Sequence, residues 1–272
     1  MRTPTLLAVL LLSLLAQAQN HRLDSLRGVW ADASRPDTVR LVAFADVIWG
    51  GYLFSDPDSA RILADSLYRE AMRKDLKANA GDALSIHGIS YIIVGQFDSA
   101  LVHLDKARAM FMEAGSLDGV AGALNNMGNA YWKKGDLSRA IELYTQALQI
   151  AEKLGKKKGI AAAELNIGLI YSDLQDTLRA MQHYRKSLDV CLEMDYADGI
   201  GQASFNLANR LAERRDTTAA LELLEQARAA FARAGNTMYL GQVLGNMGRL
   251  RTSMHRYDEA KMYLDSSMKT LA

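Results

Sequence analysis

The sequence predicts an all-α fold, a solenoid of stacked helical hairpins, and four observations support this prediction. The chain has 272 residues but only three prolines, none of which lies between Gly81 and Ala272. That stretch is rich in alanine, leucine, methionine, glutamate, arginine and lysine, which favour helices. Strand-like runs are nearly absent from it, with "ISYIIV" at 89–94 as the exception. Finally, the chain repeats itself every 40 residues, as repeat architectures do.

The repeat becomes visible when the chain from Leu41 onward is written in rows of 40 residues. Small residues recur at positions 8, 20 and 27 of the rows, and larger ones recur at positions 11 and 24. Position 20 is alanine in every row: Ala60, Ala100, Ala140, Ala180, Ala220 and Ala260. Small residues let two helices approach closely, and large ones fill the space beside them. The sequence therefore predicts about six packed units, 41–80, 81–120, 121–160, 161–200, 201–240 and 241–272.

Each row is expected to hold two helices joined by a turn. Positions 4, 7, 8 and 11 share one face of the first helix, and positions 20, 23, 24, 27 and 31 share one face of the second. Turns are predicted at residues 95, 135, 175 and 215. Aspartates are expected to cap the second helices that follow, namely Asp136, Asp176 and Asp216. These helices are expected to end near Gly115, Gly155, Asp195 and Gly235. One hairpin cannot bury its apolar face alone, so stacking of the rows is expected.

The amino terminus reads as a secretory signal peptide, residues 1–18. An apolar run at 6–16 follows Arg2 and is too short for a comfortable membrane span. The small residues of "AQA" at 16–18 then offer a cleavage site after Ala18. A retained membrane anchor is the alternative. Residues 19–40 are expected to form an N-terminal segment with a short helix within 20–34, and the mature protein is expected to be secreted or periplasmic, with no membrane span.

One segment carries a resemblance to a known family: "ALNNMGNAYWKKGDLSRAIELYTQAL", 123–148, is very similar to the tetratricopeptide repeat consensus. The resemblance extends over 41–272 and implies a right-handed superhelical solenoid with a concave inner surface. The period of 40 departs from the usual ~34 residues, the closing proline is missing, and the first and last rows are degenerate. Repeats of this length look like the secreted or sensor-linked arrays of Bacteroidota, in which a membrane helix and a signalling output domain often follow.

Position 6 is asparagine in four successive rows, at Asn126, Asn166, Asn206 and Asn246. Asparagine is a poor helix former, so its recurrence inside helices needs a reason. In the tetratricopeptide geometry positions 2, 5, 6, 9, 12 and 13 point into the concave surface. An asparagine ladder there resembles the peptide-binding ladders of kinesin light chains and of O-linked N-acetylglucosamine transferase.

The chemistry of a carboxamide suits that role, because it both donates and accepts hydrogen bonds and can pair with the backbone of an extended peptide. A row-to-row rise near ~10 Å roughly matches three extended residues at ~3.3 Å each. The alternative is structural: the asparagines bond to neighbouring backbone or to water.

Further residues of the same surface complete the predicted peptide-binding set: Asn125, Asn129, Trp132, Phe205 and Arg249. The first full row is apolar there, with Ile86, Ile89, Ile92 and Ile93. These isoleucines either extend the binding surface or are buried under residues 20–40. Trp132 and Phe205 are expected to be anchors for a partly apolar peptide, since aromatic side chains are enriched at protein interfaces.

Catalytic and metal-binding motifs are not found in the sequence. No metal or nucleotide motif appears, and "GKKKG" at 155–159 lacks the phosphate-loop spacing, leaving a solvated loop or a docking patch. Cys191 is the single cysteine and is expected to be a small buried residue rather than a reactive thiol. His103 and His183 share position 23 and are expected to be structural. The net charge of +1 gives no reason to expect nucleic acid as a partner. No catalytic residue, metal or cofactor is predicted.

The leading interpretation is a non-catalytic scaffold that binds a protein or peptide segment on the concave surface. The alternative is a sensory ectodomain whose histidine kinase, cyclase or transcription-regulator output is missing or lies on another chain. The last row has no polar capping helix after it, so Met262, Leu264, Met268 and Leu271 are expected at an uncovered face. Such a face would be covered by a homodimer or by further sequence.

Overall fold

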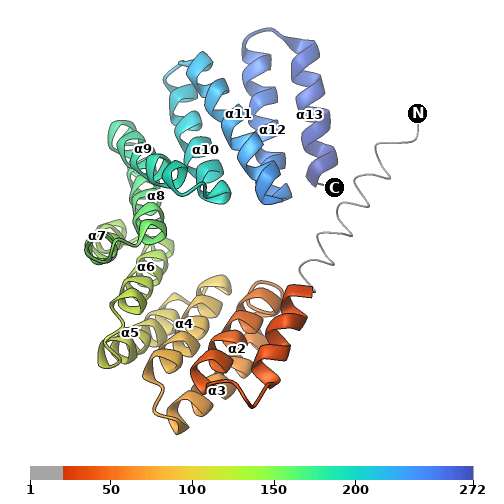
Figure 1. Cartoon of the computed structure of the whole chain (residues 1–272). Helices are drawn as coiled ribbons and strands as arrows, with labels where there is room; N and C mark the ends of the chain where they lie inside the picture. Colours follow the sequence, from red (N-terminus) through yellow and green to blue (C-terminus); the bar gives the residue numbers. More distant parts are fainter. Residues whose placement is uncertain (1–20, 272) are drawn as a thin grey trace. The chain divides into compact units, whose positions relative to one another are not determined.

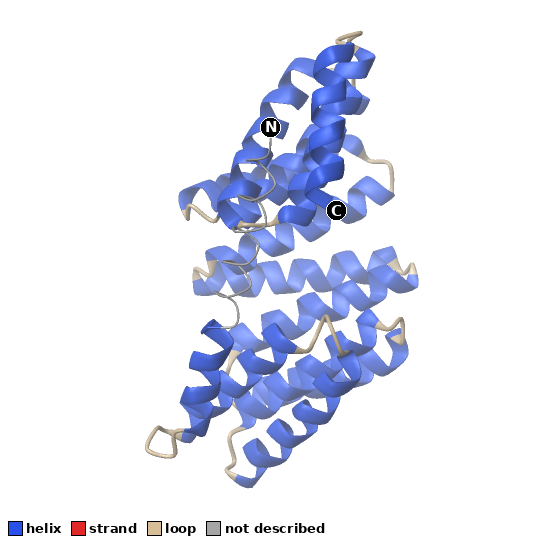
Figure 2. Cartoon of the chain, turned by 90° about the vertical axis from the view of Figure 1, so that its right-hand side faces the viewer, coloured by secondary structure: helices blue, strands red, loops and turns tan. Residues whose placement is uncertain are grey.

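The structure, a computed structural model, describes residues 21–271 and places them in helices joined by short turns (Figure 1). Figure 2 shows helix and loop only across this part of the chain, and the predicted all-α fold is confirmed. The predicted signal peptide lies outside the described residues. A first helix spans residues 21–31, as expected for the N-terminal segment. It is followed by α2 (Asp37–Gly51), α3 (Pro57–Arg73), α4 (Lys77–Ile93), α5 (Phe97–Glu113), α6 (Leu117–Lys134), α7 (Leu137–Leu154), α8 (Lys157–Asp173), α9 (Thr177–Glu193), α10 (Ala197–Glu213), α11 (Thr217–Ala234), α12 (Thr237–Ser253) and α13 (Tyr257–Leu271).

The chain forms two compact units, Met1–Ala147 and Leu148–Ala272, called here the N-terminal and C-terminal units. In the N-terminal unit α4 packs against α3 and α5, α6 packs against α5, and α2 lies against both α3 and α4. In the C-terminal unit α8 with α9, α10 with α11 and α12 with α13 form three hairpins, with α10 on α9 and α12 on α11. Both units are therefore stacks of helical hairpins.

The turns follow a stricter rule than the sequence suggested. A residue with positive φ occurs every 20 residues, closing first and second helices alike. Five of these residues are glycine: Gly95, Gly115, Gly135, Gly155 and Gly235. The other five are Asp75, Gln175, Asp195, Arg215 and His255, whose φ values lie between 50° and 64°. The predicted turns and helix ends are confirmed, because the left-handed conformation reverses the chain after each helix.

The predicted N-caps are also confirmed. The Asp136 carboxylate accepts from the Arg139 backbone N–H at 3.1 Å, and Asp176 accepts from that of Arg179 at 3.0 Å. Asp216 accepts from the Ala219 N–H at 3.3 Å. Each bond satisfies one of the backbone donors that the first turn of a helix leaves without a partner.

Close packing inside the hairpins explains the small and large positions of the repeat. A Cβ placed on Gly168 would lie 2.6 Å from a ring carbon of Tyr184, so only glycine allows α8 to approach α9 this closely. Tyr184 is fully buried, and Ala180 at position 20 is buried beside it. His183 stacks on Tyr171 with ring centroids 5.4 Å apart, and its Nδ1 lies 2.5 Å from the buried Glu164 carboxylate. The side chain at position 23 therefore packs within its hairpin.

Candidate ligand-binding face

The first helices of the hairpins carry the predicted binding residues. We call positions 2, 5, 6, 9, 12 and 13 of these helices the asparagine face. In the N-terminal unit it belongs to α4 and α6, and in the C-terminal unit to α8, α10 and α12.

In the N-terminal unit the asparagine face of α4 is covered around Ile86, whereas Ile93 at position 13 is 39% exposed. Ile86 is only 2% exposed and belongs to a core cluster with Leu41 and Ile48 of α2. Ile89 and Trp30 pack against the same cluster. The sequence left two alternatives for this apolar row, a binding surface or burial, and Ile86 is buried. The covering element is mainly α2, which begins at Asp37. The sequence had suggested residues 20–40 as the cover, so α2 starts near the end of that segment.

Contacts of Trp30, which lies near the end of the helix at residues 21–31, hold the cover on α4 in place. Its ring stacks on Phe44 with centroids 4.4 Å apart, and the Arg40 guanidinium lies 5.3 Å from the Trp30 ring centroid. Arg40 Nε also donates to the Trp30 carbonyl at 3.0 Å. Residues 21–31 are thereby fastened to α2.

The asparagine face of α6 carries four predicted residues, all of them half-buried: Asn125, Asn126, Asn129 and Trp132. Asn129 Oδ1 accepts a hydrogen bond from the Tyr144 hydroxyl at 2.7 Å, which ties it to α7. The Lys133 ammonium lies 4.6 Å from the Trp132 ring centroid. Asn129 therefore serves packing between two helices. At Trp132 the aromatic ring lies beside the cation of Lys133.

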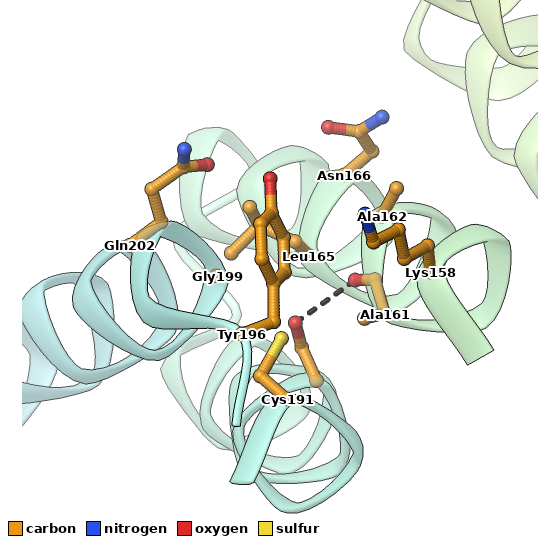
Figure 3. Close-up of a pocket in the computed structure, with 10 residues that line it drawn as sticks. Lys158, Ala161, Ala162, Leu165, Asn166, Cys191, Tyr196, Gly199 and Gln202 are labelled. Carbon is orange, nitrogen blue, oxygen red and sulfur yellow. Dashed lines mark hydrogen bonds between the residues drawn. The ribbon is translucent and has the colours of Figure 1, made fainter. Parts of the chain in front are cut away.

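In the C-terminal unit the asparagine face borders a hollow of about 200 Å³, called here the tyrosine pocket (Figure 3). Ala161, Ala162 and Leu165 of α8 form one wall, and Tyr196 and Gly199 form another. Figure 3 shows the Tyr196 ring standing in the middle, with Asn166 and Gln202 on either side. The hollow is thus apolar in its walls and flanked by two carboxamides.

The base of the tyrosine pocket is rigidly packed. Ser187 Oγ donates to the Ala161 carbonyl at 2.9 Å, which joins α9 to α8. A Cβ on Gly199 would lie 2.4 Å from Cys191 Sγ and 2.6 Å from a Tyr196 ring carbon. Burial raises the pKa of the Cys191 thiol, so the thiolate is disfavoured and the residue acts as a small buried group, as predicted.

The lining of the tyrosine pocket includes one charged side chain, Lys158. The Lys158 ammonium lies 5.1 Å from the Tyr196 ring centroid. Lys158 belongs to the "GKKKG" segment, which the sequence left between a solvated loop and a docking patch. The structure places this lysine in the lining of a hollow, while the neighbouring Lys157 pairs with Glu193 at 3.1 Å.

A second hollow, of about 490 Å³, lies along α10, α12 and α13. It brings together three predicted residues, Phe205, Asn246 and Arg249, and adds Asn209 and Gln242. Asn246 Nδ2 donates to Asn209 Oδ1 at 2.7 Å, and Arg249 donates to Asn246 Oδ1. These polar groups form a chain across two first helices.

Asn206 has a different environment from the other ladder residues. Its Nδ2 donates to the Gln202 carbonyl of its own helix at 2.9 Å, and it lines neither hollow. The ladder is therefore a sequence pattern whose members make different contacts.

Three residues of the tyrosine pocket were not among the predicted binding residues. Tyr196 stands in the turn before α10, just after the predicted helix end at Asp195. Gln202 occupies position 2, which the sequence assigned to this face without singling it out. Lys158 lies near the beginning of α8. A lone aromatic residue in a turn is a weak signal, and only the fold shows that it stands between two helices.

Within residues 21–271 no group of three histidine, cysteine, aspartate or glutamate side chains is placed to hold a metal ion. Among the same residues no helix is long and apolar enough to cross a membrane.

Comparison with known families supports the repeat assignment. The tetratricopeptide repeat model matches residues 79–153 and 119–193. A comparison with curated proteins gave no match.

Solved structures share the fold. BtubC (BKLC) from P. vanneervenii is 19% identical with a TM-score of 0.69, over 79% of this chain and 91% of that one. A Rap protein complexed with competence and sporulation factor is 14% identical with a TM-score of 0.61, over 84% of this chain and 75% of the other. The kinesin light chain repeats of Podosopora anserina are 16% identical with a TM-score of 0.55, over 69% and 92%. At these identities the likeness concerns the fold.

Proposed function

We propose that this tetratricopeptide-type protein is a non-catalytic scaffold that binds a polypeptide segment on the asparagine face of its C-terminal unit. The observation that carries the proposal is the tyrosine pocket, an apolar hollow with carboxamides at its sides. The Rap protein complexed with competence and sporulation factor supports it as an example of this fold with a bound partner. The proposal names no cofactor and no nucleic acid.

The size of the tyrosine pocket favours one side chain as its occupant. Sites for drug-sized ligands are typically about 300–1,000 Å³, whereas an apolar cavity of about 150 Å³ is enough to hold benzene. A hollow of about 200 Å³ lined by alanine, leucine, glycine and tyrosine therefore fits a single leucine, methionine or phenylalanine side chain. Burial of such a side chain contributes about 1.5–3 kcal/mol.

The carboxamides beside the pocket suit the backbone that would carry this side chain. Asn166 and Gln202 have carboxamide side chains, a group that both donates and accepts hydrogen bonds and is of the same kind as the N–H and C=O of an extended chain. Lys158 adds a donor that prefers a carbonyl or carboxylate oxygen. The bound segment is therefore expected to be extended, with an apolar anchor residue and without a strong positive charge near the anchor.

The second hollow and α6 extend the proposal within each unit. Phe205, Asn246 and Arg249 would contact a polar part of a segment bound to the C-terminal unit, and Asn209 is already paired with Asn246. Asn125, Asn126, Asn129 and Trp132 would form a separate contact surface on the N-terminal unit. The alternative for every asparagine remains a structural role.

Selection from a library of random linear peptides displayed on phage tests the proposal. Ala162 is exposed at the pocket, so Ala162→Trp is expected to fill the hollow without disturbing the core. Ala232→Trp, at an exposed alanine on α11, is the matched control. Peptides with an apolar anchor should be enriched by the natural protein and by the control, and lost with Ala162→Trp. Equal enrichment by all three proteins would place binding elsewhere.

Asn166→Ala separates the ligand role from the structural role. If the side chain binds the peptide backbone, the melting temperature stays within about a degree while peptide affinity falls roughly tenfold, the effect of about 1.4 kcal/mol. A fall of several degrees with unchanged affinity would assign Asn166 to the structure.

We also propose that the protein acts outside the cytoplasm, secreted or periplasmic, because of the leader pattern in residues 1–18. Amino-terminal sequencing of the protein from the cell envelope fraction should begin at Gln19, and an intact Met1 in that fraction would contradict cleavage. A sensory ectodomain of the Bacteroidota type is the alternative role. It would show as co-purification with a membrane kinase or cyclase whose activity depends on the bound peptide.

A further inference from the structure

Two histidines lie against each other inside the N-terminal unit. We call the group around them the histidine cluster: Arg61 and Asp65 of α3, His87 and Ser90 of α4, and His103 of α5. His87 is only 7% exposed, and its ring stacks on that of His103 with centroids 5.1 Å apart. Its Nε2 lies 3.0 Å from an Asp65 carboxylate oxygen, whereas its Nδ1 is buried and has no hydrogen-bond partner among the described residues.

The repeat shows that the fold does not require this cluster. Four of its five positions, all but that of Asp65, hold apolar residues in the next row, namely Leu101, Met127, Ala130 and Leu143. Buried polar groups lower stability unless all their hydrogen bonds are made, and one nitrogen of His87 makes none. The cluster therefore replaces ordinary core packing with side chains whose charge changes between pH 5 and 8.

The hydrogen bonds indicate which nitrogens carry hydrogen near neutral pH. The Ser99 carbonyl can only accept, so His103 Nδ1, 2.9 Å away, donates to it. The Asp65 carboxylate likewise accepts from His87 Nε2, which leaves the buried Nδ1 of a neutral His87 as an acceptor without a donor. A further proton on His87 has to go to Nδ1. There the new N–H would have no acceptor, and its charge would lie against the ring of His103.

The groups that act on His87 come from the helices on both sides of α4. From α3 come the Asp65 carboxylate and the guanidinium of Arg61, which lies 4.9 Å from the Tyr91 ring centroid and donates to Ser90 Oγ at 3.4 Å. From α5 comes the stacked ring of His103. Burial lowers the pKa of His87, the Asp65 carboxylate opposes this effect, and His103 and Arg61 lower the pKa further.

The other helices that pack on α4 direct their charges elsewhere. On α2, Asp46 acts on Asp82, which lies on another side of α4. On α6, Lys134 pairs with Asp98 of α5. The response of His87 to pH is therefore set by α3 and α5.

We propose that the histidine cluster is an acid-sensitive switch, in which neutral imidazoles keep α4 packed against α3 and α5 and protonation loosens this packing. Two unit charges about 5 Å apart at an effective dielectric constant of about 20 repel strongly enough to change an equilibrium well over tenfold, so the packed state disfavours protonation of both rings. Ile86 of α4 shares a core cluster with residues of α2 and α3, so a movement of α4 would also reach the covered part of the asparagine face. The switch goes beyond the proposed peptide scaffold and does not depend on it.

The sign of the pH effect follows from His87. Because its pKa in the folded protein lies below the reference value of 6.5, the open state binds the proton more readily than the packed state. The stability that the cluster contributes is therefore complete above about pH 6.5 and is lost as the pH falls below it. Asp82, whose pKa is raised to about 6, acts in the opposite sense, so the test must cancel its contribution.

Native-state hydrogen exchange of the α4 amides tests the switch at about pH 7.5 and about pH 5. The natural protein is compared with a variant that carries both His87→Met and His103→Leu, the residue types of the next row. Asp82 is present in both proteins and cancels in the ratio of their protection factors, natural over variant. This ratio should fall more than tenfold between the two pH values in α4 and stay constant in α10 of the C-terminal unit.

The matched control is His255→Asn, which removes an exposed histidine of the C-terminal unit and should give a ratio near one at both pH values. A ratio in α4 that does not change with pH for the double variant would overturn the proposal.

Asp65→Asn provides a second test that keeps both histidines. Asparagine can still accept from His87 Nε2, but it removes the charge that favours a proton on His87 in the folded protein. The acid-induced loss of protection in α4 should therefore become larger than in the natural protein, by roughly two- to fivefold because Asp65 is largely exposed. An equal or smaller loss in Asp65→Asn would contradict the switch.

Discussion

The same repeat face is core on α4 of the N-terminal unit and half-buried on the first helices of the C-terminal unit. In the N-terminal unit, position 6 of α4 is Ile86, buried beneath α2. In the C-terminal unit the same position is Asn166, Asn206 or Asn246, all half-buried. Asn166 and Asn246 each line a hollow, and Asn206 lines neither. The comparison teaches that a repeat column fixes where a side chain points, while its neighbours decide whether that place is core or surface.

Exchanging the residue types at position 6 should give the largest difference in stability between the two faces. Ile86→Asn removes a buried side chain and leaves a carboxamide among apolar groups, so we expect a loss of about 4 kcal/mol in the free energy of unfolding. The reverse exchange, Asn206→Ile, concerns a half-buried site and should change it by about 0.5 kcal/mol or less. Urea unfolding measures both, and similar losses would mean that the two faces are equally buried.

The packing of α2 on α4 also affects the pKa of a carboxyl group, that of Asp82. Asp82, at position 2 of α4, has its pKa raised to about 6 by burial and, second, by the nearby Asp46 of α2. A raised carboxyl pKa means that the folded state holds its proton more tightly than the unfolded state, whose pKa is near 3.8. The free energy of unfolding should therefore fall as pH rises from about 4 to about 6, by about 2–3 kcal/mol in all.

Asp82→Asn tests this pH dependence. The variant cannot ionise there, so its stability should lose this slope between pH 4 and 6 and exceed that of the natural protein at pH 8. Asp46→Asn should reduce the slope less, because burial is the larger cause. Thermal unfolding at several pH values measures the slopes, and an unaltered slope in Asp82→Asn would show that Asp82 is hydrated in the folded protein.

A third change tests a feature that the two units share. Ala140 and Ala220 hold position 20 in the N-terminal and C-terminal units, and both are fully buried. Leucine at either place should overpack the hairpin and cost roughly 1–3 kcal/mol. Matched falls in melting temperature for Ala140→Leu and Ala220→Leu are expected, and an unchanged value for either would contradict close packing at that hairpin.

Much of this fold follows from the sequence because the signals are local and repeated. The same hairpin geometry is indicated in row after row by the alanines of position 20, the glycines of position 8 and the capping aspartates. A substitution in one row therefore does not hide the pattern that the other rows share. The cover over Ile86 could not be predicted firmly, because it depends on how residues outside the regular rows pack. The tyrosine pocket was missed for the same reason, since Tyr196 joins it from a turn.

The two units finally differ in how their turns are closed, and this gives the smallest expected effect. Among the residues of the N-terminal unit that the structure describes, Asp75 is the one left-handed residue other than glycine. The C-terminal unit has Gln175, Asp195, Arg215 and His255. Such residues carry a cost of about 1–2 kcal/mol that glycine avoids, partly offset by the greater freedom of glycine in the unfolded chain.

Arg215→Gly is therefore expected to raise the free energy of unfolding by about 0.5–1 kcal/mol. Gly135→Ala, at φ 86° in the N-terminal unit, should lower it by about 1 kcal/mol. Both sites are exposed, so the changes act through the backbone and not through packing. Urea unfolding resolves changes of this size. Should Arg215→Gly be neutral or destabilising, the arginine side chain would have to make a compensating contact, and the difference between the two units would lie in their faces alone.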